Sequence, residues 1–430
     1  MVVGTIVAGP HPRFRSPNPP VPDHSRATAF RNVELRMVIT IPRPAGLLGG
    51  MLAVMLGATS AVAQSFAEVD ATVRDGIQRG LYPGAVVVIG RRDSVLYARG
   101  YGHYTWSPAS RVPDPDSTMW DIASITKIVA TTSAAMRLVD RNKLQLDAPV
   151  HRYLPRFSGG PKNRVTVRML LDHTSGLRSY VPFYTRAHRS RARMIDLLYA
   201  QPLVRAPGDS AEYSDLNALL LGLVVERISG VPLDQLARRE VFMPLGLSST
   251  MYKPPASLRP RIVPSGIWRG HPVPGEVNDQ NAVAMGGVAG HAGVFSTGMD
   301  LARYATVWLR AGAGPREQWV SPATIRRFLV KGPNSGSRLL GWDTPELEGD
   351  EPSVFGTLIS DAAYGHTGFT GTELWIDPSR DLYLVFLTNR AFDPRTRDSL
   401  KELKVVRAAL SDAAIRLVPH GCAQELVSRC

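Results

Sequence analysis

The hydrophobic positions near both ends of the chain follow the two-residue period of β-strands. Residues 84–90 are almost entirely apolar, residues 94–102 alternate, and the polar tripeptide 91–93 joins them, which predicts a β-hairpin. Three more strands are predicted towards the C-terminal end, over residues 337–343, 365–377 and 381–390. Strands are therefore expected from both ends of the sequence.

Between these ends the apolar residues recur with the spacing of helices. That spacing is found over residues 125–140, 166–173, 192–200, 214–229, 232–242 and 299–312, and further helices are predicted over 66–81 and 400–418. Strands at the ends and helices between them favour an α/β fold of the α+β type, with one antiparallel sheet flanked by helices. A mostly helical second lobe, roughly residues 125–290, is then inserted between the sheet-forming ends.

The first 63 residues differ from the rest of the sequence. Residues 45–63 carry no charge and end in the small-residue pattern Ala-Val-Ala, which is typical of a secretory signal peptide cleaved before Gln64. We expect residues 1–63 to be an N-terminal extension and signal peptide, residues 64–430 to form one domain, and the mature protein to be periplasmic or secreted. An uncleaved anchor is the alternative, disfavoured because the run is short and holds four glycines.

Composition and charge restrict the function classes only slightly. The apolar content of 44% with 20% charged residues is that of a soluble globular protein with an ample core. The net charge of +13 permits association with an anionic envelope surface, but the charges are scattered, so nucleic-acid binding is not expected. Oligomeric state cannot be predicted from these features.

The cysteines and histidines do not form a known metal motif. Cys422 and Cys430 are the only cysteines and lie in the last nine residues, where export would allow a disulfide; two free thiols are the alternative. The sequence contains no Cys-x-x-Cys and no His-Glu-x-x-His, so neither a metal nor another cofactor is expected.

Ser124 and Lys127 form the first candidate reactive pair. Of seven lysines, only Lys127 follows a serine by three positions, and residues i and i+3 share one face of a helix. A lysine whose pKa is lowered can take the proton of a serine hydroxyl, and a helix start would add backbone N–H groups beside the serine oxygen. In the alternative interpretation Ser124 only caps the helix and Lys127 is solvated.

Two later stretches favour the reactive interpretation. The run "AEYSDLN" places Tyr213 and Asp215 directly before an apolar helix, and the run "YGHTGFTG" places His366, Thr367 and Gly368 at the start of a predicted strand. Ser-x-x-Lys, then Tyr-Ser-Asn or a variant, then Lys-Thr-Gly or His-Thr-Gly is the ordered motif set of a known superfamily.

The sequence resembles the serine β-lactamase and penicillin-binding protein superfamily. The order and long separations of the motifs are similar to its class C-type branch, which includes DD-peptidases and esterases. The resemblance covers roughly residues 66–415, and the runs 170–177 and 286–297 are similar to family loops. It implies a β-lactamase/DD-peptidase-like fold.

The resemblance also implies catalytic roles. Ser124 would attack a carbonyl and become acylated, Lys127 would hold or accept the proton, and Tyr213 would relay it to the leaving group with a pKa lowered by the ammonium. Whether Lys127 or Tyr213 is the acylation base stays open. The backbone N–H groups of Ser124 and Phe369 would form the oxyanion hole.

The substrate-binding motifs depart from the family pattern at two positions. The strand with His366, Thr367 and Gly368 would line the cleft and pair with the substrate, but β-lactamases usually have a permanently charged lysine where His366 stands. Asp215 replaces the usual asparagine; its carboxylate can only accept hydrogen bonds and could hold Lys127 charged, which would shift the base role to Tyr213.

Four further side chains have plainer interpretations. Asp172 and His173 are interpreted as a hydrogen-bonded loop pair, although a relay is the alternative. His291 lies between glycines, which alone predict a tight turn, but it could border the cleft. Trp375 is predicted to pack in the core.

We therefore predict an exported serine hydrolase that works through an acyl-enzyme on an amide or ester. The predicted substrate is a D-amino-acid peptide, as for a DD-carboxypeptidase, so the expected partner is a small molecule or peptide such as a peptidoglycan-like peptide, an ester or a β-lactam. The alternatives are an esterase or β-lactamase on the same site, and a penicillin- or cell-wall-peptide-binding protein without turnover.

Overall fold

The computed structural model describes residues 66–188, 190–268, 271–346, 353–392 and 396–418. All of them belong to one compact unit of the chain. The predicted signal peptide and both cysteines, Cys422 and Cys430, lie outside the described residues, so these predictions stay untested.

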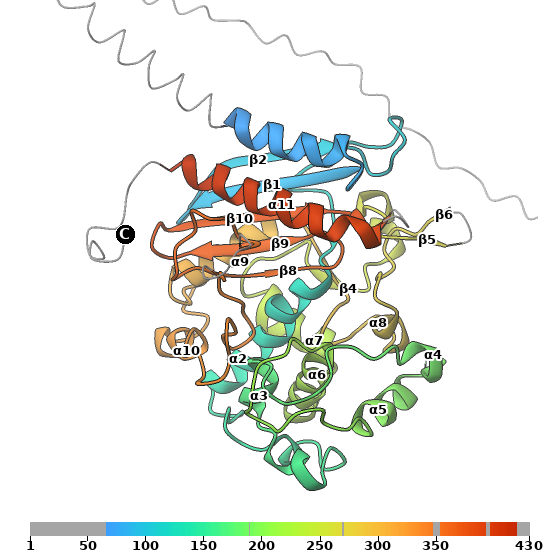
Figure 1. Cartoon of the computed structure of the whole chain (residues 1–430), viewed down its shortest axis with the longest axis vertical. Helices are drawn as coiled ribbons and strands as arrows, with labels where there is room; N and C mark the ends of the chain where they lie inside the picture. Colours follow the sequence, from blue (N-terminus) through green and yellow to red (C-terminus); the bar gives the residue numbers. More distant parts are fainter. Residues whose placement is uncertain (1–65, 189, 269–270, 347–352, 393–395, 419–430) are drawn as a thin grey trace, which may run out of the picture. The chain divides into compact units, whose positions relative to one another are not determined.

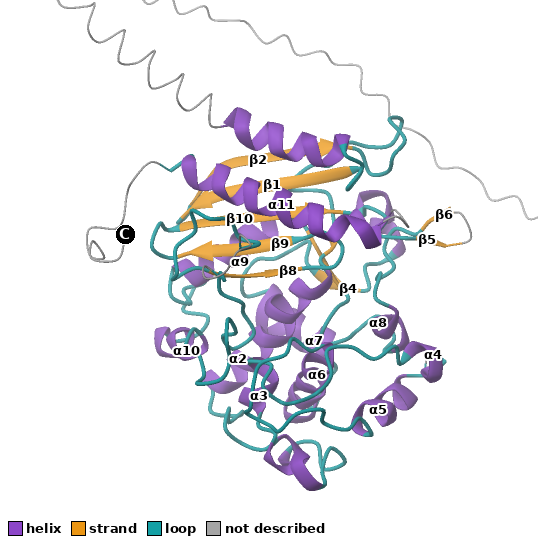
Figure 2. Ribbon diagram, viewed as in Figure 1, coloured by secondary structure: helices purple, strands orange, loops and turns teal. Residues whose placement is uncertain are grey.

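The main sheet of the described residues has five antiparallel strands, drawn from both ends of the chain (Figures 1 and 2). Its order is β2-β1-β10-β9-β8, with β1 Gly84–Arg91, β2 Ser94–Gly102, β8 Tyr364–Thr367, β9 Glu373–Asp377 and β10 Leu382–Thr388. The two ends meet where β1 pairs with β10, from Ala85 opposite Thr388 to Arg91 opposite Leu382. The α/β fold class predicted from the sequence is confirmed.

Both faces of this sheet are covered, which explains the continuous apolar run of β1. Successive strand residues point to opposite faces: Val86 and Val88 belong to the core cluster on the α9 side, whereas Val87 and Ile89 belong to the cluster beneath α11. Figure 1 shows α11 (Thr396–Arg416) crossing one face and α9 (Gly298–Leu309) on the other. The helix of residues 66–78 contributes Val69 and Val73 to the α11 side.

Between β2 and β8 most of the regular elements are helices, joined by long loops (Figure 2). The α-helices there are α2 Ser133–Asp140, α3 Val167–Leu171, α4 Tyr184–Ala187, α5 Arg191–Tyr199, α6 Asp215–Ser229, α7 Leu233–Ala237, α8 Gln280–Ala284, α9 and α10 Pro322–Phe328. Short strands form two small sheets. One has the order β3-β7-β4, with β3 Trp120–Asp121, β7 Val294–Ser296 and β4 Met251–Tyr252; the other pairs β5 (Ile267–Trp268) with β6 (His271–Pro272).

Helix α6 runs through the core of this helical part. It begins after the N-cap Ser214, whose hydroxyl accepts from the N–H of Asn217, and ends at Gly230 with a φ of 72°, the left-handed position that favours glycine. No single helix among the described residues has the length and hydropathy to cross a membrane. Among the described residues, only α6 and the stretch Leu233–Phe242 together have that length and hydropathy, and a bend of 75° separates them. Most of α6 is buried.

Three sequence predictions of local structure were wrong. Residues 125–140 are not one α-helix, because a π-helix over Lys127–Thr132 precedes α2. The predicted strand 337–343 has only isolated bridges, such as Arg338 to Asp343. Residues 365–377 form two strands, since a turn containing Gly371 (φ 98°) separates β8 from β9; glycine readily supplies such a bend.

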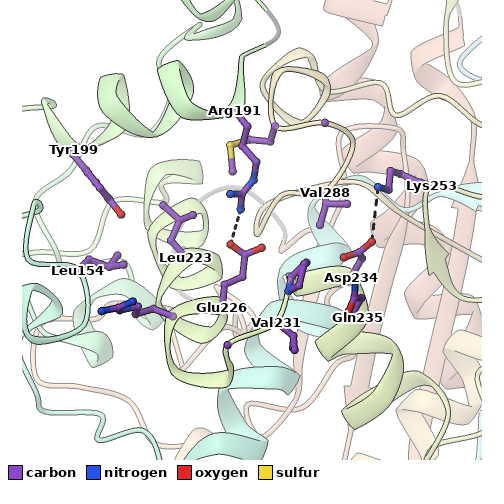
Figure 3. A pocket seen from close by; sticks show the side chains of 15 residues that line it. Leu154, Arg191, Tyr199, Leu223, Glu226, Val231, Asp234, Gln235, Lys253 and Val288 are labelled. Carbon is purple, nitrogen blue, oxygen red and sulfur yellow. Dashed lines mark hydrogen bonds and ion pairs between the residues drawn. The ribbon is translucent and has the colours of Figure 1, made fainter.

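A hollow of about 740 Å³ lies on the helical part, among α5, α6 and α7 (Figure 3). The acidic side chains in it are paired: Glu226 with Arg191 at 2.5 Å, and Asp234 with Lys253 at 3.9 Å. Its lining contains no serine, cysteine or threonine, so a nucleophile must be sought elsewhere.

Candidate active site

Ser124 lies on a strained turn directly after β3. The preceding residue, Ala123, has a φ of 46°, a left-handed conformation that is uncommon for a residue with a Cβ. The buried carboxylate of Asp121 holds this turn, because its two oxygens accept from the N–H groups of Ala123 at 2.9 Å and Asn278 at 2.7 Å. The turn presents Ser124 partly exposed at its tip.

Lys127 lies directly behind Ser124 and is buried, with only 3% of its surface exposed. Its Nζ donates to Ser124 Oγ at 2.8 Å and to the carbonyl of His291 at 3.2 Å, and forms an ion pair with Asp215 at 2.7 Å. Burial acts to lower the pKa of Lys127, but Asp215 and Tyr213 outweigh it and raise the pKa above its ordinary 10.5. Asp215 therefore keeps Lys127 charged.

Tyr213 completes the contacts of Ser124. Its hydroxyl donates to Ser124 Oγ at 2.9 Å, and the Lys127 ammonium lies 5.0 Å from its ring centroid. The predicted lowering of the Tyr213 pKa was wrong, because burial raises this pKa by more than the adjacent ammonium lowers it. At neutral pH both neighbours of Ser124 Oγ thus carry their protons.

His173 anchors the segment that carries Tyr213. Its Nδ1 accepts from the N–H of Ser214 at 3.0 Å, and its ring centroid is 4.9 Å from that of Tyr213. Burial holds the pKa of His173 well below 6.5, so the imidazole is neutral. The neighbouring Asp172 instead accepts from the N–H and hydroxyl of Thr174. Each residue fixes a loop, but their side chains do not form the predicted hydrogen-bonded pair with each other, and they form no relay.

The His-Thr-Gly segment lies at the edge of the main sheet. His366 is buried, its Nδ1 donates to the carbonyl of Thr367 at 2.7 Å, and burial lowers its pKa to about 3. It is therefore neutral and lies against Tyr213, with ring centroids 5.9 Å apart. Gly368 passes so close to the Ser124 turn that a Cβ would come within 2.8 Å of the carbonyl of Ile122.

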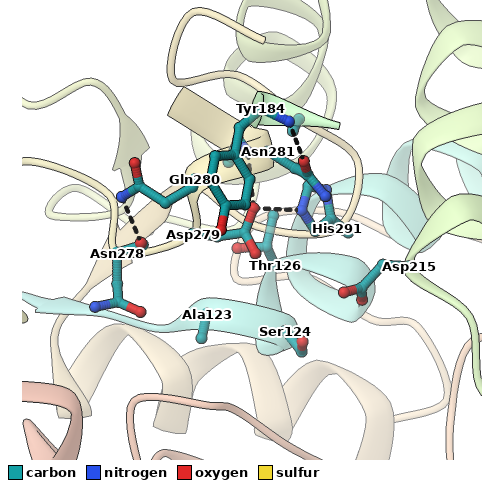
Figure 4. Close-up of polar contacts among 12 residues, drawn as sticks. Ala123, Ser124, Thr126, Tyr184, Asp215, Asn278, Asp279, Gln280, Asn281 and His291 are labelled. Atoms are coloured by element: carbon teal, nitrogen blue, oxygen red, sulfur yellow. Dashed lines mark hydrogen bonds and ion pairs between the residues drawn. The ribbon is translucent and has the colours of Figure 1, made fainter. Parts of the chain in front are cut away.

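A pocket of about 550 Å³ opens in front of Ser124 (Figure 4). The sequence-predicted residues that line it are Ser124, Asp215, His291 and Phe369; the others in its lining are Asp121, Ala123, Tyr180, Tyr184, Asn278, Asp279, Gln280 and Ala292. Lys127, Tyr213, His366, Thr367 and Gly368 are not in this lining. The site thus has two sides, with Ser124 between the pocket and the Tyr213 side.

Comparison with known proteins identifies the family. The model of the Beta-lactamase family matches residues 69–409. The chain belongs to the β-lactamase family. The resemblance inferred from the motifs is confirmed, and this β-lactamase-family protein is a serine hydrolase.

Curated relatives of this family member are named as enzymes of amide hydrolysis. N-acetylmuramyl-L-alanine amidase of Bacillus subtilis is 33% identical over 360 residues, which are 76% of this chain and 81% of the amidase. A putative D-alanyl-D-alanine carboxypeptidase of Escherichia coli is 30% identical over 352 residues, 73% of this chain and 80% of that protein.

Solved structures of low sequence identity share the fold. EstCE1, a hydrolase with promiscuous acyltransferase activity, matches with a TM-score of 0.63 at 24% identity, covering 82% of this chain and 99% of EstCE1. The octameric penicillin-binding protein homologue of Pyrococcus abyssi matches with a TM-score of 0.64 at 22% identity, covering 81% and 77%. Both comparisons support the β-lactamase-type fold.

Two acidic residues of the β-lactamase-family site were missed by sequence reasoning. Asp121 fixes the Ser124 turn, and Asp279 lies 2.8 Å from His291 Nε2. Asp215, Asp279 and His291 bring ligand atoms within 4.8 Å of one another, although the Lys127 ammonium already neutralises Asp215. No sequence spacing predicts this group, because its members come from separate segments. An aspartate one residue ahead of α8 predicts only an N-cap, which Asp279 also is.

Proposed function

We propose that this chain is an exported serine hydrolase that cleaves D-amino-acid peptides through an acyl-enzyme on Ser124. The observation that carries the proposal is that Ser124 Oγ accepts from Lys127 Nζ at 2.8 Å and from Tyr213 OH at 2.9 Å. Amide cleavage is supported by the names of the Bacillus subtilis and Escherichia coli relatives. Export rests on the leader in the sequence, with residues 64–430 as the hydrolase domain.

The proposed acylation begins with the loss of one proton from the site, because Lys127 and Tyr213 are both protonated at rest. After Lys127 or Tyr213 has lost a proton, that group takes the hydroxyl proton of Ser124 while Oγ bonds to the substrate carbonyl carbon. The N–H groups of Ser124 and Phe369 would stabilise the oxyanion. Tyr213 would protonate the leaving nitrogen, so that the C–N bond breaks and the acyl group stays on Ser124. Water then cleaves the ester.

Arg338 is proposed to contact the carboxylate of the leaving group. Its guanidinium carbon lies 5.3 Å from the centroid of Tyr213, and its side chain is one-fifth exposed and paired with Asp343 at 3.0 Å. Because Tyr213 would protonate the leaving nitrogen, the leaving amino acid must lie on this side of Ser124. Because Asp343 already pairs with its charge, Arg338 would contribute guanidinium N–H donors to this carboxylate.

We expect the purified protein to release D-alanine from an acyl-D-alanyl-D-alanine peptide with a kcat/KM at least tenfold above that for p-nitrophenyl acetate. Arg338 and the edge of β8 can contact the peptide but not the acetate, and such contacts add binding energy to the transition state. D-alanine release and nitrophenol absorbance provide the two rates, with Ser124→Ala as control. Turnover of the acetate without release of D-alanine would favour an esterase and contradict the proposal.

A further inference from the structure

The pocket in front of Ser124 carries an excess of negative charge. Three carboxylates line it, those of Asp121, Asp215 and Asp279, and its lining contains no lysine or arginine. The buried ammonium of Lys127 pairs with Asp215 at 2.7 Å and neutralises that carboxylate. The carboxylate of Asp121 is enclosed by backbone N–H groups, which leaves Asp279 as the charge that a ligand can reach.

His291 contacts only one oxygen of the Asp279 carboxylate. Asp279 Oδ1 accepts from His291 Nε2 at 2.8 Å and from the N–H of Ala282 at 2.7 Å. His291 is 1% exposed, and its Nδ1 has no hydrogen-bond partner among the described residues. Both of these bonds to Asp279 are made by Oδ1, so Oδ2 of the carboxylate is left for a ligand.

Asp279 remains ionised and accessible from the pocket. Burial alone would raise the pKa of its carboxyl, but the hydrogen bonds and charges of His291, Ala282 and Lys127 lower the pKa to about 2. Its side chain is 26% exposed. Figure 4 shows its carboxylate directed towards the space above Ser124, with Asp215 to one side.

Aromatic rings surround the same pocket. Tyr180, Tyr184 and Phe369 line it and are 44%, 39% and 53% exposed. Exposed aromatic faces next to an ionised carboxylate attract organic cations, because the ring quadrupole and the carboxylate both favour positive charge. Phe369 already has the Arg390 guanidinium 4.6 Å from its ring centroid, so the two tyrosines are the faces left for a ligand. The lining offers an anionic substrate group no lysine or arginine.

The acyl part of a substrate is expected in this pocket. The leaving group has to reach Tyr213, which is not in the pocket lining, whereas Ser124 and Phe369 are. Since Ser124 lies between the two sides, a group in this pocket belongs to the part of the substrate that stays on the serine.

We infer that Asp279, with Tyr180 and Tyr184, forms a subsite for an ammonium group on the acyl side of the substrate. The substrate class is a peptide whose diamino acid or free N terminus places a primary ammonium next to the residue that acylates Ser124. The inference rests on the proposed function for the position of the scissile bond, and Asp279 acts as a specificity-determining residue.

Three lysyl-D-alanyl-D-alanine peptides test the subsite: one with a free side-chain amine, one with a free α-amine, and one acetylated at both. We expect at least one ammonium peptide to have a kcat/KM at least tenfold above the diacetyl peptide at low ionic strength, with a smaller ratio in high salt because exposed charges are screened. The peptide with the higher kcat/KM shows whether the subsite binds a side-chain ammonium or an N-terminal one. If the kcat/KM of each ammonium peptide is within twofold of that of the diacetyl peptide, the inference is overturned.

Asp279→Asn is expected to reduce this ratio to below three. The ratio compares substrates on the same preparation, so partial misfolding of the variant does not change it. Asp234→Asn is the matched control, because Asp234 is 28% exposed and pairs with Lys253 in the other hollow; it should keep the wild-type ratio. A full ratio in Asp279→Asn would exclude Asp279 as the determinant.

The experiments distinguish a failure of the ammonium subsite from a failure of the proposed peptidase function. Hydrolysis of all three peptides at equal rates, lost in Ser124→Ala, would support the proposed function alone. If no peptide is cleaved, p-nitrophenyl esters of 6-aminohexanoate and 6-acetamidohexanoate test the subsite without an amide bond. We expect the aminohexanoate ester to be preferred at least tenfold, and equal rates would overturn the subsite.

Discussion

Replacing Lys127 with methionine is expected to lower kcat/KM by about three to four orders of magnitude, because Ser124 loses the group that holds or accepts its proton. Lys127 is 3% exposed, donates to Ser124 Oγ at 2.8 Å and pairs with Asp215 at 2.7 Å. The substitution also leaves Asp215 without its ion-pair partner, which is expected to cost about 3 kcal/mol of unfolding free energy. Steady-state kinetics and chemical denaturation measure the two effects.

A second substitution separates these effects. In Lys127→Met with Asp215→Asn no unpaired charge remains, so most of the lost stability should return while activity stays low. The ion pair raises the pKa of Lys127 in the folded protein, so its stabilisation is present below the unfolded pKa and is lost only as the pH rises through the folded pKa. Denaturation at pH 7 is therefore a fair comparison. Recovery of activity in the double variant would show that Lys127 has no part in the reaction.

Asp215→Asn alone should move the pH profile of kcat/KM to lower pH by about one to three units. In the wild type Lys127 and Tyr213 both have raised pKa values, and acylation needs one of these protons to be lost. Activity should accordingly increase with pH from neutral into the alkaline range. Asparagine removes the main cause that raises the Lys127 pKa, and burial then lowers it.

The position of the pH profile, not the maximal rate, decides this prediction. Asp234→Asn removes a carboxylate of the other hollow and should leave the profile in place. If the alkaline limb of Asp215→Asn coincides with that of the wild type, another group controls the proton of Ser124. The same result would contradict the conclusion that the ion pair with Asp215 raises the pKa of Lys127.

The fold could be predicted where the sequence pattern and tertiary burial agree. The apolar run at residues 84–90 marks a strand because both faces of the sheet are covered. The strand predicted at 337–343 failed because its apolar residues, Leu339, Leu340 and Trp342, are buried in a loop that packs into the core. The π-helix at Lys127 also follows from packing, which local propensity does not encode.

The chemistry of the site could be predicted only as far as residue type and order reach. Ser124, Lys127 and Tyr213 were found from their motifs, and the structure brings their polar atoms together. The sign of the Tyr213 pKa shift was missed because it depends on depth of burial. Asp279 was missed because its role comes from a loop contact with His291, far from any motif.

The measurement that tests the central claim most directly is intact-mass spectrometry after incubation with benzylpenicillin, and separately with a fluorophosphonate, on wild type and Ser124→Ala. The wild type is expected to gain the mass of one acyl or phosphonyl group, located by peptide mapping on the segment that contains Ser124. Ser124→Ala should gain none. An adduct of equal yield on the alanine variant would contradict the account, because the nucleophile would then be another residue.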